Sequence, residues 1–143
     1  MRSFHGPNIV VTTPDGWEDI SDLEDGLPPF LTLIKEDGDG ALQFSAGRAD
    51  LHIASSSQPV MEWLLAYYNL DRWGPAIELV AEDTPLILAA ATFNHDSEPM
   101  RVWVITNGAK SAIIHYTIEA SAFDITELAE CEDIVRSTRF VSD

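Results

Sequence analysis

The chain has 143 residues, 45% of them hydrophobic, and it carries 24 acidic against 8 basic side chains, for a formal net charge of −16. This length predicts a single domain over residues 1–143, with a core that needs neither disulfides nor a metal. The negative charge excludes nucleic acid and anionic membranes as expected partners, because both would repel it.

The first part of the chain is predicted to form strands joined by tight turns. Residues 8–12 are β-branched and apolar, which is typical of a strand, and 14–16 (Pro-Asp-Gly) turn the chain. Two further strands are predicted over 30–34 and 41–46. The acidic, glycine-containing segment 36–40 between them is typical of a hairpin turn.

A helix is predicted from Ser57 or Gln58 to about Arg72, with Pro59 in its first turn and Gly74-Pro75 as its stop. The side chains expected to share one face are Val60, Leu64, Tyr67 and Tyr68. Further apolar side chains spread around the helix, so it is more apolar than one buried stripe requires.

Four strands are predicted next, over 76–81, 86–93, 100–106 and 111–118. Asn107-Gly108 between the last two is a strong hairpin signal. The third strand alternates Val102 and Val104 with Trp103 and Ile105, so both of its faces are apolar. A sheet covered on both faces has this pattern.

The chain is predicted to end in a helix over 125–138, where Asp124 and Glu127 resemble a capping box. Its expected core stripe is Ile125, Leu128, Cys131, Ile134 and Val135. Strands joined by short turns must run antiparallel. The predicted fold class is therefore α+β, an antiparallel sheet of about six to seven strands flanked by helices.

The residue pattern predicts no catalytic set, no metal site and no cofactor. The histidines are His5, His52, His95 and His115, and no two have a metal-ligand spacing. His115 alternates with Ile113 and Thr117, which favours a hydrogen-bonded core histidine over a general base. Cys131 lies among acidic residues and is expected in the core. Segment 37–40 begins like a calcium loop but lacks the later ligands, which favours a hairpin turn.

The single cysteine and the N-terminal residues bear on the compartment. Cys131 has no partner for an intramolecular disulfide, which suits a reducing cytosol. Residues 1–11 lack the apolar stretch of a signal peptide, and the longest apolar stretch, 86–91, is far short of a membrane span. A cytoplasmic protein is expected.

Two segments are candidate protein-binding surfaces. Between positions 15 and 25 lie six carboxylates: Asp15, Glu18, Asp19, Asp22, Glu24 and Asp25. They form either a solvated loop or a docking surface that steers a basic partner. The helix aromatics are Trp63, Tyr67, Tyr68 and Trp73, which are either buried against the sheet or leave surface for a partner or a homodimer. The residues predicted to bind protein are Asp19, Asp22, Glu24, Asp25, Tyr67, Tyr68 and Trp73.

Four segments resemble the PsbP-like superfamily, which also holds the Ran-binding Mog protein and bacterial DcrB-like proteins. They are Thr13-Pro14-Asp15-Gly16-Trp17-Glu18-Asp19, Leu42-Gln43-Phe44-Ser45, Arg101-Val102-Trp103-Val104 with its Asn-Gly turn, and Ile134-Val135-Arg136-Ser137-Thr138-Arg139-Phe140. The resemblance spans most of the chain and implies an antiparallel sheet between helices, an α/β/α sandwich. It brings no catalytic residue, because these families are mostly binding proteins.

The bacterial DcrB-like branch includes chaperone-adaptors of type VI secretion effectors, and small acidic proteins of similar build act as immunity proteins against secreted toxins. The chaperones place an arginine soon after the serine-ending strand. Here Arg48 follows Ser45 by three positions, but the next segment is short and polar, which departs from the chaperone pattern.

The leading functional hypothesis is a non-enzymatic bacterial immunity protein that binds and neutralises a basic secreted toxin, because a strongly acidic protein can occlude a basic active site. The first alternative is a type VI secretion effector chaperone, which would receive hydrophobic effector segments. The second is a small-molecule binder or enzyme with a pocket near His115 beside a carboxylate.

Overall fold

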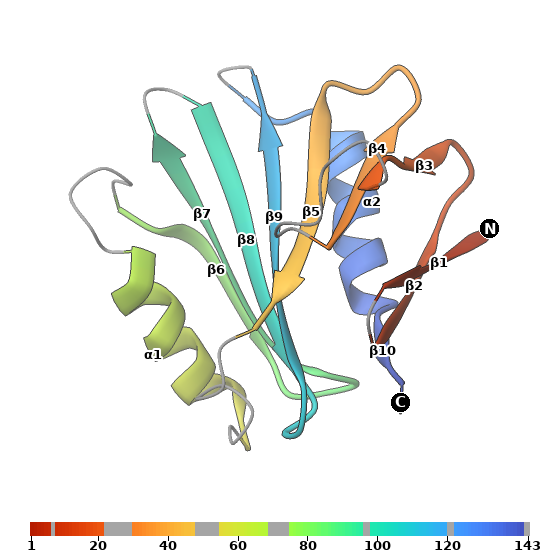
Figure 1. Cartoon of the computed structure of the whole chain (residues 1–143). Helices are drawn as coiled ribbons and strands as arrows, with labels where there is room; N and C mark the ends of the chain where they lie inside the picture. The colour runs from red at the N-terminus through yellow and green to blue at the C-terminus, as the bar shows by residue number, and fades with distance from the viewer. Residues whose placement is uncertain are drawn as a thin grey trace.

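The computed structural model describes residues 1–6, 8–21, 30–47, 55–68, 75–95, 98–119 and 122–141. The strands that it describes form a seven-stranded antiparallel sheet and a smaller three-stranded sheet. Figure 1 shows α1 packed on one face of the large sheet and α2 on the other. The α+β class and the helix-flanked antiparallel sheet are therefore confirmed.

The strands of the large sheet follow the order β3-β4-β5-β9-β8-β7-β6. Their bounds are Trp17–Asp19 for β3, Leu31–Lys35 for β4, Gly40–Ala46 for β5, Ile77–Glu82 for β6, Ile87–His95 for β7, Glu98–Thr106 for β8 and Ser111–Ile118 for β9. Six of these strands were predicted within a few residues, whereas β3 lies in a segment that was predicted only to be acidic.

The small sheet has the order β1-β2-β10, with β1 at Arg2–Gly6, β2 at Ile9–Thr13 and β10 at Arg139–Phe140. Only β2 was predicted. It joins the two ends of the chain, because β1 pairs along all of β2 and β10 pairs with Ile9 and Val10. This sheet packs with α2 against one face of the large sheet.

The two faces of β8 differ as the sequence predicted. Trp103 and Ile105 belong to the core under α2, whereas Val102 and Val104 belong to the core under α1. All four side chains are fully buried. The alternation extends to the neighbouring strands, because Phe44 and Ile114 are paired in register with Trp103 and lie in the same core.

Helix α1 is described over Ser57–Tyr68, and its predicted end at Arg72 lies outside the described residues. Val60, Leu64 and Tyr68 are buried and pack on β7 and β8. Tyr67 was predicted to share this face, and the prediction was wrong, because its side chain is 48% exposed. One residue along a helix turns by about 100°, which takes Tyr67 off the stripe that ends at Tyr68.

Helix α2 spans Ile125–Arg136, two residues less than predicted. The predicted N-cap is confirmed, because the Asp124 side chain accepts a hydrogen bond from the Glu127 amide at 3.0 Å. Cys131, Ile134 and Val135 are fully buried as predicted. Ile125 was expected in the same stripe, but it is 84% exposed because it occupies the first helical position, beyond the edge of the core.

The turn between β8 and β9 contains the predicted Asn107-Gly108 pair but has four residues, from Asn107 to Lys110. The Asn107 side-chain oxygen accepts the amides of Ala109 and Lys110 at 2.9 and 2.7 Å. Gly108 has φ +90°, which glycine adopts without a steric penalty.

Strand β6 ends the large sheet and is irregular. Its pairing with β7 shifts between Ile77 and Val80, so two of its residues lie opposite one residue of β7. Within this bulge Glu78 has φ +53°, a conformation that a side chain with a Cβ rarely adopts.

Candidate functional site

The acidic segment is described only in part. Asp22, Glu24 and Asp25 lie outside the described residues. Asp19 is exposed at the end of β3, and its carboxylate accepts the Ser21 amide at 2.8 Å and the Ser21 hydroxyl. Asp15 pairs with the N-terminal ammonium group at 3.2 Å. These two carboxylates therefore have partners within the chain.

The helix aromatics divide between surface and core. Trp63 and Tyr67 stack on each other with ring centroids 4.9 Å apart and an interplanar angle of 18°. Trp63 is partly buried against the core, while Tyr67 remains accessible. Tyr68 is buried, and Trp73 lies outside the described residues. Of the predicted protein-binding aromatics, Tyr67 is thus the accessible one that the structure describes.

His115 is half-buried and hydrogen-bonded, so the predicted hydrogen bond is confirmed. Its Nε2 lies 2.5 Å from the Tyr68 hydroxyl oxygen, and the Tyr68 ring stacks on Phe93 at 5.3 Å. Burial lowers the pKa of His115 and raises the pKa of Tyr68, which favours the neutral forms of both. We assign the tautomer in which Tyr68 donates and Nε2 accepts. This contact ties α1 to β9.

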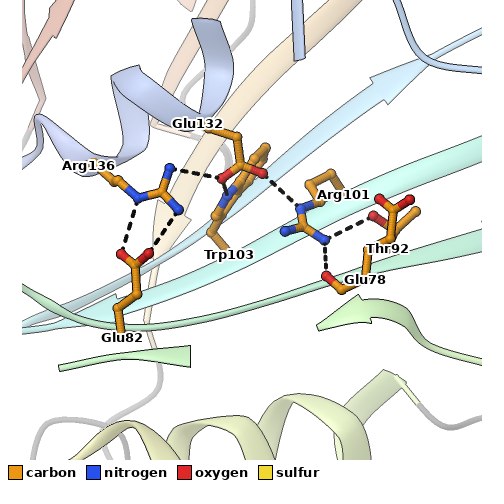
Figure 2. Close-up of polar contacts among 7 residues, drawn as sticks. All are labelled: Glu78, Glu82, Thr92, Arg101, Trp103, Glu132 and Arg136. Atoms are coloured by element: carbon orange, nitrogen blue, oxygen red, sulfur yellow. Dashed lines mark hydrogen bonds and ion pairs between the residues drawn. The ribbon is translucent and has the colours of Figure 1, made fainter. Parts of the chain in front are cut away.

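A polar network joins α2 to the large sheet (Figure 2). The Glu132 carboxylate accepts from Arg101 Nε at 3.1 Å and from Trp103 Nε1 at 2.9 Å. Arg101 Nη1 donates to the Glu78 carbonyl at 2.6 Å and to the Thr92 hydroxyl at 3.0 Å. The Arg101 side chain is nearly inaccessible, so its charge is neutralised inside the protein.

The cations beside this network are also paired. Arg136 donates to both carboxylate oxygens of Glu82, at 3.1 and 3.0 Å, and lies 3.6 Å from Glu132. Lys35 pairs with Glu130, and this hydrogen bond raises the pKa of Lys35. On the α2 side, the positive charges of Lys35 and Arg136 are therefore paired with glutamates of the chain and do not reduce the negative charge elsewhere on the surface.

The opposite face of the large sheet holds an open cavity of about 470 Å³. Its lining residues are Ile34, Gly38, Asp39, Gly40, Ala41, Glu98, Thr117, Ile118 and Glu119. Ile34, Ala41 and Thr117 form its floor and belong to the face that carries α1, because Leu33, Leu42 and Tyr116 next to them lie in the α2 core.

Three carboxylates, from Asp39, Glu98 and Glu119, line this cavity and are called here the carboxylate row. Gly40 pairs with Ile118, and Met100 pairs with Thr117. The recorded pairing ends there, and Asp39, Glu98 and Glu119 lie one or two residues beyond it, where a continued register would put Asp39 and Glu98 on either side of Glu119. None of the three forms an ion pair with another residue that the structure describes. Like charges opposite one another in a sheet are destabilising.

The cavity and the end of α1 are connected through β9. Thr117 lies at the cavity, and His115, two residues earlier on the same face, contacts Tyr68. Alternate residues of a strand are roughly 7 Å apart. Figure 1 shows that the C-terminal end of α1 is the end of this helix that points toward the β4–β5 hairpin. The cavity and Tyr68 therefore lie on the same face of the large sheet.

Two further reactive side chains, those of Cys131 and Tyr116, are enclosed. Cys131 is fully buried, and burial, followed by the charge of Glu127, raises its pKa. The Tyr116 hydroxyl donates to Glu127, and burial is the main cause of its raised pKa. No cluster of His, Cys, Asp and Glu in the described residues has the geometry of a metal site.

The sequence contained little signal for the carboxylate row. Asp39 was assigned to a hairpin turn, while Glu98 and Glu119 are distant from it in sequence and were not singled out. Only the pairing of β5, β9 and β8 brings them together. A correct strand register would have found the row, since each residue lies just beyond a strand end or at a strand start.

Comparisons with known proteins support the fold. No family model and no curated protein matches the sequence. Among solved structures, a protein from Bacteroides thetaiotaomicron VPI-5482 has a TM-score of 0.65 and 16% identity, with 99% of this chain and 48% of that chain covered. The chain thus spans about half the length of that protein.

A second solved structure is the cyanobacterial PsbP (CyanoP) from Synechocystis sp. PCC 6803. It has a TM-score of 0.52 and 17% identity, with 93% of this chain and 86% of that chain covered. The similarity shows a PsbP-like fold, as the resemblance implied. In the described part of the chain, no helix is long and apolar enough to cross a membrane.

Proposed function

We propose that this chain is a non-enzymatic protein-binding module whose partner is basic. The observation that carries the proposal is the row of Asp39, Glu98 and Glu119 at an open cavity, without an ion-pair partner in the described residues. Their mutual repulsion is relieved when a lysine or arginine of a partner enters. The net charge of −16 adds long-range attraction, which raises the rate of encounter.

The disposition of the other polar groups supports binding rather than catalysis. His115 does not line the cavity, and its Nε2 is engaged with Tyr68. Cys131 is buried, with its pKa raised away from the thiolate form.

Within this proposal we favour an immunity protein that neutralises a basic secreted toxin in the cytoplasm of a bacterium. The alternative is a chaperone of a type VI secretion effector. The acidic cavity favours the first role, because a chaperone for hydrophobic segments needs an apolar groove. Co-expression with the protein encoded by the neighbouring gene distinguishes them: an immunity protein restores growth of cells producing it, whereas a chaperone raises its soluble yield without affecting growth.

Binding of an oligolysine peptide, measured by calorimetry over a salt series, tests the site. Asp39→Asn/Glu98→Gln should weaken binding about tenfold at low salt, since each lost charge contact contributes up to about 1 kcal/mol. The matched control is Glu78→Gln/Asp133→Asn, which removes two exposed charges away from the cavity. Equal weakening by both variants would mean that only the net charge matters and would contradict the proposed site.

A further inference from the structure

The aromatic side chains of α1 form a supported series of rings. Tyr67 stacks on Trp63, and its ring also meets the ring of Tyr68 edge-on at 4.9 Å and 67°. Tyr68 is fixed in turn by its stack on Phe93 and its hydrogen bond to His115. The ring of Tyr67 is therefore held in place although nearly half of the side chain is accessible. An exposed aromatic ring that is already ordered loses little entropy on binding.

No cation of the described residues occupies this ring. Within the described ranges, the cation–π contacts are those of Arg2 with Phe4 and Arg101 with Trp103. Helix α1 contains no Lys or Arg, and its single charged residue is Glu62. A second copy of this chain is a poor occupant, because each copy carries a net charge of −16. A positively charged partner is the complementary one.

We propose, resting on the function proposed above, that the basic partner binds through an arginine-bearing segment that reaches from the carboxylate row to Tyr67. Its guanidinium group stacks on the Tyr67 ring, and a neighbouring basic side chain enters the cavity. The link through Thr117, His115 and Tyr68 brings the two contacts within reach of one segment. Arginine fits better than lysine, because its planar guanidinium stacks on aromatic rings and is more weakly hydrated.

Two peptides of equal length and charge, one of arginine and one of lysine with the same spacer residues, test this surface by calorimetry. We expect wild-type protein to bind the arginine peptide about two- to fivefold more tightly than the lysine peptide. Tyr67→Ala should abolish this preference without weakening the lysine peptide, and Tyr67→Phe should retain it. Because Tyr67 is exposed, both variants should fold.

The Asp39→Asn/Glu98→Gln variant separates the two proposals, because it should weaken both peptides while leaving the arginine preference intact. Equal wild-type affinity for the two peptides would overturn the arginine contact and leave the proposed function standing. Equal weakening of both peptides by Tyr67→Ala would overturn it as well, since Tyr67 would then act as general apolar surface. Failure of wild-type protein to bind either peptide would overturn both proposals.

Discussion

The Tyr68 hydroxyl lies 2.5 Å from Nε2 of His115 and joins the last turn of α1 to the middle of β9. The side chains around His115 on the same face are Gln43 and Val102, its register partners on β5 and β8. No carboxylate of the described residues forms an ion pair with it. A positive charge on the His115 imidazole would therefore have no paired negative charge among the described residues.

This contact predicts loss of stability in mild acid. Burial lowers the pKa of folded His115 below the unfolded value of about 6.5, so the unfolded chain binds the proton more strongly. The free energy of unfolding should therefore decline as pH falls through that value. Above it, His115 is neutral in both the folded and the unfolded chain and does not affect stability. Urea melts at pH 7.5 and 5 should show a larger decline for wild type than for His115→Gln, which does not titrate. An equal decline would place the acid sensitivity elsewhere.

Trp103→Ala should lower the free energy of unfolding by about 3–5 kcal/mol, because a fully buried indole leaves a cavity in the core under α2. Trp103→Phe should cost less, since it keeps most of the packing and loses the Nε1 hydrogen bond to Glu132. Denaturant melts of both variants provide the measurement. A loss under about 1 kcal/mol for Trp103→Ala would show that this core tolerates the vacancy.

Glu132→Ala should cost about 3–5 kcal/mol, because it leaves the nearly inaccessible Arg101 without its carboxylate partner. Asp133→Ala, on the exposed side of the same helix, is the matched control and should change stability by less than about 0.5 kcal/mol. Thermal melts of the two variants test the difference. Similar melting temperatures would mean that Arg101 finds another partner when Glu132 is removed.

Glu119→Gln should stabilise the folded protein by a few tenths of a kcal/mol to about 1 kcal/mol, since it relieves repulsion from Asp39 and Glu98. The same change should weaken oligolysine binding. Opposite effects on stability and binding are the signature of residues retained for function. If Glu119→Gln instead destabilises the protein, the carboxylate has a structural partner and the row is not a binding site.

The acidic segment yields a prediction that rests on the sequence alone, since Asp22, Glu24 and Asp25 lie outside the described residues. Replacing the three by Asn or Gln should slow association with the basic partner and flatten its salt dependence, while dissociation stays largely unchanged. Charges at the rim act through the long-range field, which salt screens over about 8 Å at physiological ionic strength. Stopped-flow measurements at low salt test this. An unaltered association rate would make the segment a solubilising surface.

The sequence predicted the parts of the fold that depend on local pattern. The alternation around Trp103 located the sheet and its two covered faces, and Asp124 marked the start of α2. Strands β1, β3 and β10 were missed because they are short or polar, so that pairing rather than composition determines them. The carboxylate row was missed for the same reason, since it depends on the register of three strands.

The bulge in β6 has a consequence for the sheet as a whole. Among the described strands, β6 is the last of the large sheet, and an edge strand presents backbone groups with which another chain can pair. Glu78, with its φ of +53°, interrupts the regular spacing of these backbone groups. Arg101 donates a hydrogen bond to the Glu78 carbonyl from inside the protein. A straight incoming strand cannot match this irregular edge. The buried arginine that anchors α2 thereby also holds in place an irregular edge of the kind that resists edge-to-edge aggregation.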